Sequence, residues 1–226
     1  RECGDEPLLI ARRTGAPVFV GERRVEAGRA LLAAHPEVRV IISDDGLQHL
    51  PLARDIEVCV FDERGIGNGW LLPAGPLREP WPRRADLVLR PASAGGIDGL
   101  RVDRRLATEA VRADGSRRAL TELAREPVAA LAGIARPQAF FDMPRRAGIA
   151  PALEIALPDH HDFDAQPVDI PAGHTLLCTE KDAVKLWARH PDAWAVPLEV
   201  AIEPAFWSSL DRLLDARLSS NDGSQT

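Results

Sequence analysis

The sequence has few cysteines and no long hydrophobic run. Cys3, Cys59 and Cys178 are far apart and form no CxxC pair, which excludes a disulfide framework and the usual zinc-binding patterns. Cys59 and Cys178 lie within apolar runs, so we expect small core residues in a protein of a reducing cytosol. No apolar run approaches the roughly 20 residues that span a bilayer, and no signal peptide is visible.

Positive charge is not in excess either. The formal net charge is −6, so bulk electrostatics does not favour a nucleic-acid partner. Hydrophobic residues make up 45% and charged residues 27% of the 226 residues, which is ordinary for one large soluble domain or two modest α/β units. The first residue is Arg1 and the opening stretch is typical of mid-protein sequence, so we expect the chain to start inside a longer one.

Short apolar runs alternate with helical patterns along the chain. Nearly continuous apolar strands separated by helices predict α/β structure with parallel sheets covered on both faces. The predicted strands are Pro17–Val20, Val38–Ser43, Ile56–Asp62, Asp86–Leu89, Val128–Ala132, Leu153–Leu157, Thr175–Thr179 and Trp194–Val200. The predicted helices are Arg23–Ala34, Pro137–Ala147, Asp182–Ala188 and Ala205–Arg217.

The composition changes between Pro91 and Arg125, where paired glycines and charged residues indicate an exposed connection or hairpin. We therefore predict a domain boundary near Glu126. Residues 1–125 would form a first domain with its connecting segment, and residues 126–218 a smaller α/β domain. Residues 219–226, rich in Ser, Asn, Asp and Gly, are predicted to be a disordered tail.

Asp44 and Asp45 directly follow the predicted strand Val38–Ser43. Carboxylates at the carboxyl end of a parallel strand lie where open α/β folds bind ligands. Paired acids there suit Mg²⁺, which is held by one or two carboxylates beside substrate phosphates. A polar turn that leaves a strand accounts for Asp-Asp-Gly equally well.

Two later segments also place polar groups after apolar runs. His160 and His161 follow Leu157-Pro158-Asp159, and such histidines accept protons, bind metals or lie in a solvated turn. In the second segment, Thr179 is predicted to cap a helix that has Asp182 in its first turn. Lys181 would meet an anionic substrate or pair with a carboxylate.

Two further segments have simple structural explanations. In the glycine-rich stretch of residues 65–80, Arg78 and Glu79 would face a phosphate and a cation, although an irregular surface loop has the same composition. Near the start, Pro7 predicts a helix from Leu8 with Asp5 as its cap.

The order of these segments carries more information than any one of them. The sequence resembles the tetraacyldisaccharide 4'-kinase family from Gly4 to about Leu214. The matching motifs are Gly4-Asp5-Glu6-Pro7, Ser43-Asp44-Asp45-Gly46-Leu47-Gln48-His49, Leu52-Ala53-Arg54-Asp55, Gly67-Asn68-Gly69, Leu72-Pro73-Ala74-Gly75-Pro76-Leu77-Arg78-Glu79, Ala132-Gly133-Ile134, Phe140-Phe141, Asp159-His160 and Thr179-Glu180-Lys181-Asp182-Ala183-Val184-Lys185.

The resemblance implies an N-terminal P-loop kinase domain joined to a smaller α/β domain, with the active site between them. The implied reaction transfers the γ-phosphate of ATP, with Mg²⁺, to the 4'-hydroxyl of a lipid A disaccharide 1-phosphate in lipopolysaccharide biosynthesis. The implied location is peripheral, at the cytoplasmic face of the bacterial inner membrane.

The resemblance also implies roles for single residues. Asp5 would be the catalytic base, assisted by His160. Asp44 would bind Mg²⁺, with Glu79 as a further acidic contributor, and Arg78 would stabilise charge on the transferring phosphoryl group. Residues expected to line the site are Glu6, Asp45, Gln48, His49 and Lys181.

One departure from the family pattern is that no GxxxxGK[ST] motif occurs in the sequence. A P-loop cradles the phosphates of ATP, so the resemblance implies an incomplete P-loop-NTPase-like parallel sheet that lacks the P-loop strand and helix. An unpaired sheet edge or apolar face would then be exposed. The family's N-terminal membrane-associating segment is also absent, and we expect little or no kinase activity from these residues alone.

Two alternatives remain at this point. One is a metal-dependent phosphoesterase that holds two cations through residues Asp44, Asp45, Asp159, His160 and His161. The other is a non-catalytic fragment that binds the lipid headgroup without turnover.

Overall fold

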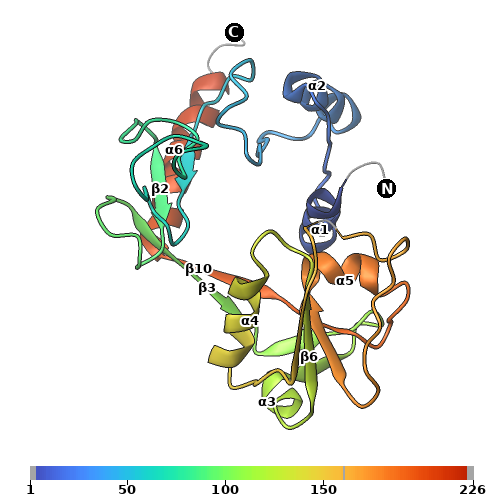
Figure 1. The fold of residues 1–226 in the computed structure, drawn as a ribbon. Coiled ribbons are helices and arrows are strands. Elements are labelled where there is room, and N and C mark those ends of the chain that lie inside the picture. The colour runs from blue at the N-terminus through green and yellow to red at the C-terminus, as the bar shows by residue number, and fades with distance from the viewer. Residues whose placement is uncertain (1–3, 160, 223–226) are drawn as a thin grey trace. The chain divides into compact units, whose positions relative to one another are not determined.

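The chain forms one sheet of four strands and one of six, each accompanied by helices (Figure 1). The structure is a computed structural model that describes residues 4–159 and 161–222, without the side chains of Asp5 and residues 220–222. It divides into a first unit, Arg1–Val18 with Arg104–Glu199, and a second unit, Phe19–Asp103 with Val200–Thr226. The predicted α/β class is confirmed.

The first unit contains the six-stranded sheet, in the order β5-β4-β9-β8-β6-β7. Strand β6 pairs in parallel with β7 and β8, β8 pairs in parallel with β9, and β4 is antiparallel to both β5 and β9. The strands are β4 Glu109–Val111, β5 Arg117–Ala119, β6 Val128–Ala132, β7 Leu153–Ala156, β8 Thr175–Thr179 and β9 Trp194–Val196.

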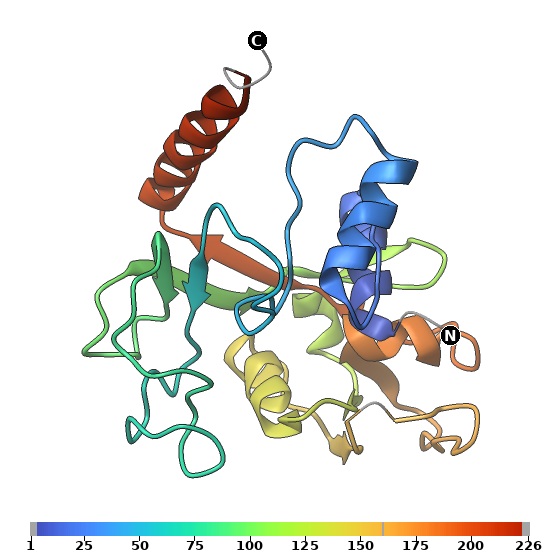
Figure 2. The ribbon, with the colours of Figure 1, turned by 90° about the horizontal axis from the view of Figure 1, so that it is seen from above.

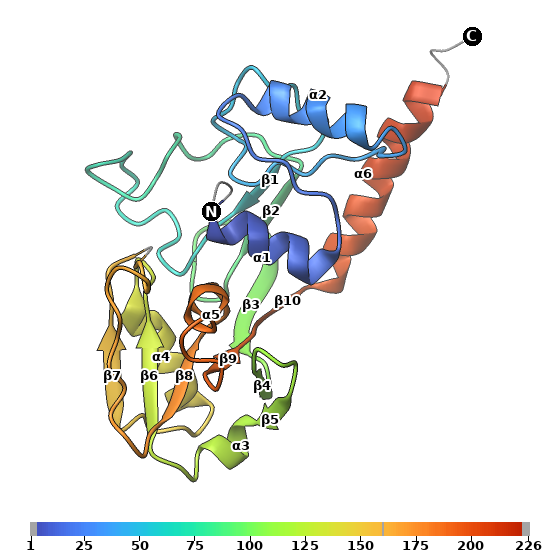
Figure 3. The ribbon, with the colours of Figure 1, turned by 90° about the vertical axis from the view of Figure 1, so that its right-hand side faces the viewer.

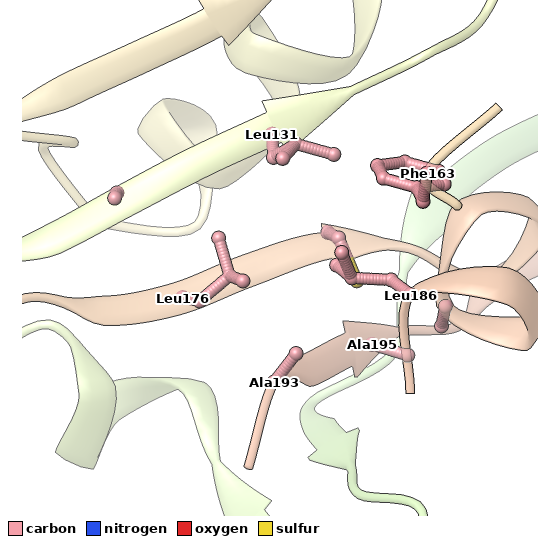
Figure 4. Packing of buried hydrophobic residues seen from close by; sticks show 9 residues of the cluster. Leu131, Phe163, Leu176, Leu186, Ala193 and Ala195 are labelled. Atoms are coloured by element: carbon pink, nitrogen blue, oxygen red, sulfur yellow. The ribbon is translucent and has the colours of Figure 1, made fainter. Parts of the chain in front are cut away.

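Helices cover this sheet because its central strand is apolar on both faces. All residues of β6 are buried; Ala130 and Ala132 pack with Phe140 and Phe141 of one helix. On the opposite face, Leu131 belongs to a cluster with Phe163, Leu176 and Leu186 (Figure 4). The helices of this unit are α1 Asp5–Thr14, α3 Leu120–Leu123, α4 Pro137–Arg146 and α5 Glu180–Leu186.

The second unit contains the four-stranded sheet, in the order β1-β2-β3-β10. Its strands are β1 Val58–Val60, β2 Leu87–Arg90, β3 Leu100–Leu106 and β10 Leu198–Ile202, and its helices are α2 Arg24–Ala34 and α6 Pro204–Asp222. Helix α6 follows the end of β10 (Figure 2). Phe206 of α6 packs with Leu87, Leu89 and Val102 to form the core of this unit.

Two predicted strands do not form. Residues 17–20 and 38–43 have no strand structure, and the side chains of Val40, Ile41 and Ile42 are exposed, with Ile42 at 90%. An apolar run becomes a strand only when a neighbour pairs with its backbone groups. Within the described residues, no strand pairs with either run, so apolar character alone overpredicted them.

The division of the chain differs from the predicted boundary near Glu126. Residues 91–125 were expected to be an exposed connection or hairpin. They contain the antiparallel pair β4–β5, but they also supply β3 and α3, and β4 pairs with β9. The first unit therefore consists of two separate segments of the chain: Arg1–Val18, which contains α1, and Arg104–Glu199. For residues 219–222 the predicted tail is wrong, because α6 continues to Asp222; no Gly or Pro interrupts the helix after Pro204. Residues 223–226 of the predicted tail lie outside the described residues.

The cysteines behave as predicted where they are described. Cys59 and Cys178 are buried free thiols, and burial raises the pKa of each. Cys3 lies outside the described residues.

Candidate active site

The carboxyl edge of the six-stranded sheet gathers polar residues from several segments. Strands β6 and β8 are neighbours in the middle of the sheet. From β6 the chain continues to β7, toward one edge, and from β8 it continues to β9, toward the other edge (Figure 3). In open α/β sheets, ligands bind where the direction of the connections reverses in this way. The residues that follow these strand ends are Gly133 after β6, Asp159 after β7 and Glu180 after β8.

Gly133 brings the three strand ends close together. Its backbone N–H donates to Asp182 Oδ2 at 3.0 Å. A Cβ at this position would lie 2.9 Å from Asp182 Oδ1 and 3.4 Å from both the Pro158 oxygen and the His161 Cβ. Only glycine allows the turn after β7 and the start of α5 to approach the end of β6 this closely.

Asp182 is a buried carboxylate, 3% exposed, that fixes the start of α5. Thr179 Oγ1 accepts from the Asp182 backbone N–H at 3.1 Å and donates to Asp182 Oδ2 at 2.7 Å. The predicted Thr179 cap is thus confirmed. Burial raises the pKa of Asp182, and the hydrogen bonds from Thr179 and Gly133 oppose that rise.

His161 is a structural residue of the turn after β7. Its side chain is buried, with Nε2 2.9 Å from the Gln166 oxygen and the ring edge-on to Phe163 at 4.8 Å between centroids. Its backbone N–H donates to the Pro158 oxygen at 3.2 Å. His160, the predicted assistant of the base, lies outside the described residues.

Lys181 contacts Glu6, another predicted site-lining residue, and also Asp159. Its Nζ lies 3.2 Å from Asp159 Oδ1 and 3.5 Å from Glu6 Oε1. Partial burial lowers the pKa of Lys181, but the hydrogen bond and charge of Asp159, followed by those of Glu6, outweigh that effect and raise the pKa overall. Lys181 was predicted either to meet an anionic substrate or to pair with a carboxylate. In this structure it pairs with carboxylates.

Asp5 occupies the first turn of α1. The helix begins at Asp5 after Gly4, so the predicted start at Leu8 with Asp5 as its cap is wrong. The glycine takes the cap position with φ 77°, a backbone conformation that glycine adopts without strain. The side chain of Asp5 lies outside the described residues, and its neighbour Glu6 contacts Lys181.

The remaining predicted site residues belong to the second unit. Asp45 Oδ2 lies 3.2 Å from Arg78 Nη1 in an exposed ion pair. Gln48 Nε2 donates to Glu79 Oε1 at 2.7 Å. The His49 backbone N–H donates to the Gly46 oxygen at 3.0 Å and closes the turn of residues 46–49, which follows Asp44 and Asp45 in the chain. Asp44 itself is exposed.

An ion-pair network that was not predicted supports Glu79. Arg83 Nη1 lies 3.1 Å from Glu79 Oε2, and Arg83 also pairs with Glu57. Arg54 Nε donates to Glu57 Oε1 at 2.7 Å. Glu57 and Arg83 are 26 residues apart and belong to no recognised motif, so this pair could not be predicted from the sequence.

Of the two residues predicted to contact Mg²⁺, Asp44 is exposed and Glu79 is half-buried. Both oxygens of Glu79 already contact Gln48 and Arg83, whereas Asp44 is exposed. Within the residues that the structure describes, no group of three or more His, Cys, Asp or Glu side chains is arranged to hold a metal ion. Mg²⁺ bound with a nucleotide needs only one or two carboxylates beside the phosphates.

These features define an α/β protein with a candidate ligand site at the carboxyl edge of parallel strands. The family model of LpxK, tetraacyldisaccharide-1-P 4'-kinase, matches residues 1–215, and the chain belongs to this family. None of the described helices is both long and apolar enough to cross a membrane.

Several relatives share this similarity. Tetraacyldisaccharide 4'-kinase of Acidovorax ebreus (strain TPSY) is 59% identical over 222 residues, covering 97% of this chain and 65% of the relative. The protein of the same name from Polaromonas naphthalenivorans (strain CJ2) is 57% identical over 237 residues, covering 100% of this chain and 69% of the relative. The chain therefore spans about two thirds of the length of these relatives.

A solved structure is similar in fold. The crystal structure of an "apo" form of LpxK from Aquifex aeolicus in complex with ATP has a TM-score of 0.76 and 26% sequence identity, and the match covers 93% of this chain and 69% of that one.

Proposed function

We propose that this chain is part of a kinase that transfers the γ-phosphate of ATP to the 4'-hydroxyl of a lipid A disaccharide 1-phosphate. The observation that carries the proposal is the contact of one ammonium, that of Lys181, with Glu6 and Asp159. These are the sequence neighbours of Asp5 and His160, in a chain whose relatives are named tetraacyldisaccharide 4'-kinase.

The proposed chemistry on the first unit is proton removal from the sugar hydroxyl. Asp5 would accept the proton as the hydroxyl oxygen attacks the γ-phosphorus, while the bond from the γ-phosphorus to the β,γ-bridging oxygen breaks and ADP leaves. His160 would orient the carboxylate. The bridge through Lys181 supports this pairing, since it holds the segment before Glu6 and the turn after Asp159 to the same group.

The proposed chemistry on the second unit is binding and charge stabilisation. Asp44 would hold Mg²⁺, which when bound with ATP neutralises charge on the phosphates. Arg78, with an exposed guanidinium, would stabilise the transferring phosphoryl group. Glu79 is held by Gln48 and Arg83 and would add negative charge near the cation. Asp45, Gln48 and His49 would line this part of the site.

The proposed setting is the cytoplasmic face of the bacterial inner membrane, with peripheral attachment, because the proposed substrate is a membrane lipid.

The test uses the protein that contains this chain at the length of its relatives. Radiolabelled γ-phosphate from ATP should appear at the 4' position of tetraacyldisaccharide 1-phosphate, and Asp5→Ala should abolish the transfer. Asp211→Ala, which removes an exposed carboxylate from α6, should leave it unchanged. Full turnover in Asp5→Ala would refute the assignment of the base.

The phosphoesterase alternative would have to use His161 through Nδ1. The other ring nitrogen, Nε2, lies 2.9 Å from the Gln166 oxygen, and the ring packs edge-on against Phe163. Hydrolysis of a simple phosphoester by the same protein, without ATP, would nevertheless revive that alternative. Binding of the disaccharide without transfer would favour a headgroup-binding protein.

A further inference from the structure

We propose that Lys181 is a positioning residue that holds the amino end of α1 against the turn after β7. The two residues that Lys181 contacts, Glu6 and Asp159, are the sequence neighbours of Asp5 and His160. The inference rests on the proposed function for its catalytic consequence, and the contact itself is a feature of the first unit alone.

The contact joins three segments that are far apart in the sequence. Lys181 Nζ lies 3.2 Å from Asp159 Oδ1, after β7, and 3.5 Å from Glu6 Oε1, in the first turn of α1. The Lys181 side chain is 17% exposed, against 36% for Asp159 and 64% for Glu6. The ammonium is therefore the sheltered centre of the contact, and the two carboxylates are the more exposed partners.

The base of the Lys181 side chain is firmly anchored. Its neighbour Asp182 is buried, is bonded to Thr179 and accepts the Gly133 N–H from the end of β6. Lys181 thus projects from a point tied to two central strands. A fixed cation of this kind can define where the two carboxylate segments lie.

The residue type fits the geometry. An ammonium is a compact point charge with three donors, which can serve carboxylates from different directions, whereas the planar guanidinium of arginine best matches one carboxylate with two parallel bonds. Lys181 and Lys185 are the only lysines among 28 basic residues, and both lie in α5.

Helix α1 has a second attachment at its other end. Arg13 Nη2 lies 3.2 Å from Glu180 Oε2 and donates to the Leu198 oxygen at 3.2 Å. Loss of the Lys181 contact should therefore free only the end of α1 that contains Asp5. The Glu6 and Asp159 carboxylates remain in contact with solvent, which screens their attraction to Lys181. The bridge is therefore expected to affect placement more than folding.

The kinetic experiment compares Lys181→Met, Lys181→Arg and the matched control Lys185→Met in the protein at the length of its relatives. Misplacement of a catalytic group by about 1 Å costs on the order of 100-fold, so Lys181→Met should lower kcat about 10- to 100-fold. Its KM for ATP should stay within about threefold of wild type, since the lost interaction acts at the chemical step. Lys181→Arg should recover part of the loss, and Lys185→Met should retain wild-type kcat.

Hydrogen exchange provides a readout that does not depend on activity. In Lys181→Met, exchange should accelerate at the amides of Leu9 and Ile10, whose helical acceptors lie in the first turn of α1, and stay unchanged at Gly15, which bonds to Ala11 at the Arg13 end. Unchanged exchange and unchanged kcat in Lys181→Met would overturn the inference, as would an equal loss of kcat in Lys185→Met. If Lys181→Met accelerates exchange but the wild-type protein shows no transfer activity, the role of the contact would be supported and the proposed function rejected.

Discussion

At the scale of single residues, His160 and His161 are adjacent in sequence, but only His161 has a role that the structure describes. Its buried ring bonds to Gln166 and packs on Phe163. His161→Ala should lower the free energy of unfolding by about 1–3 kcal/mol, because the Gln166 oxygen loses its partner and a packed ring is removed.

The same substitution should leave catalysis almost intact. We expect kcat of His161→Ala to stay within about threefold of wild type, whereas His160→Ala should lower kcat by about 100- to 10,000-fold, the usual contribution of acid–base assistance. Steady-state kinetics at a temperature where both variants are folded makes the comparison. Equal losses of kcat in the two variants would contradict the assigned roles.

Asp182 is expected to matter for stability. In Asp182→Ala, the Gly133 N–H loses its acceptor and the Thr179 cap loses its reciprocal bond, which should cost about 1–3 kcal/mol in denaturant unfolding. Asp142→Ala, which removes a carboxylate from the surface of α4 where it pairs with Arg145, should stay within about 0.5 kcal/mol of wild type.

The pH dependence of this effect has a definite sign. The folded-state pKa of Asp182 is raised, so the folded state binds this proton more tightly than the unfolded state. The contribution of the group to stability is then greatest below the unfolded pKa and falls as pH rises through the folded pKa. Asp182→Asn should remove this part of the pH dependence.

Residue-level prediction from sequence succeeded where the interactions are local. Thr179 as a cap and Asp182 in the first turn follow from a spacing of three residues. The bond from Gly133 to Asp182 joins residues 49 apart and exists only because β6 and β8 are neighbours. Strand order of that kind is not encoded in any short motif.

At the scale of elements, Glu126 joins the strand β5 to the start of β8. It accepts hydrogen bonds from Arg118, in β5, and from Thr175 at 2.6 Å. The bond from Arg118, and then that from Thr175, lower the pKa of Glu126 from 4.5 to about 2. The pair is partly exposed, so its contribution to stability is discounted for solvent screening.

The lowered pKa of Glu126 predicts the pH range in which its contribution to stability is lost. This contribution is fully present above the unfolded-state pKa and is lost as pH falls from 4.5 through about 2. Glu126→Gln should therefore lower the melting temperature at pH 7 and lose less additional stability than wild type across that acid range. Calorimetry from pH 7 down to about 2 checks this prediction; parallel melting curves for the two proteins would contradict it.

Strands were predictable from apolar runs only when a partner was present. The runs at Val128–Ala132 and Thr175–Thr179 form strands with the predicted bounds, because each lies between neighbours. Residues 38–43 are as apolar, but no strand of the described chain pairs with them. A hairpin was one of the two structures predicted for the stretch that forms β4 and β5, but its strands were not located, since charged residues hide the strand pattern.

At the scale of the whole molecule, the sequence contains no GxxxxGK[ST] motif and spans about two thirds of the length of its relatives. Because a P-loop supplies the backbone N–H groups and the lysine that bind ATP phosphates, the isolated 226-residue chain should show little or no ATP-dependent transfer. Calorimetric titration with ATP and a transfer assay would check this. Turnover equal to that of a protein at the length of its relatives would contradict it.

The family and the α/β class followed from the order of motifs, and the comparisons confirm both. The division of the chain did not follow in the same way. Residues 1–18 join the unit formed by Arg104–Glu199, an arrangement that depends on contacts between distant segments such as Arg13 and Glu180.

The central claim is that Asp5 and His160 act together on one substrate hydroxyl. The most direct test is a double-mutant cycle on kcat for 4'-phosphorylation with Asp5→Asn, His160→Ala and the double variant. Groups that act as a unit are not additive, so the double variant should be no slower than the slower single variant within about threefold. Losses that multiply in the double variant, or wild-type turnover in either single variant, would contradict the account.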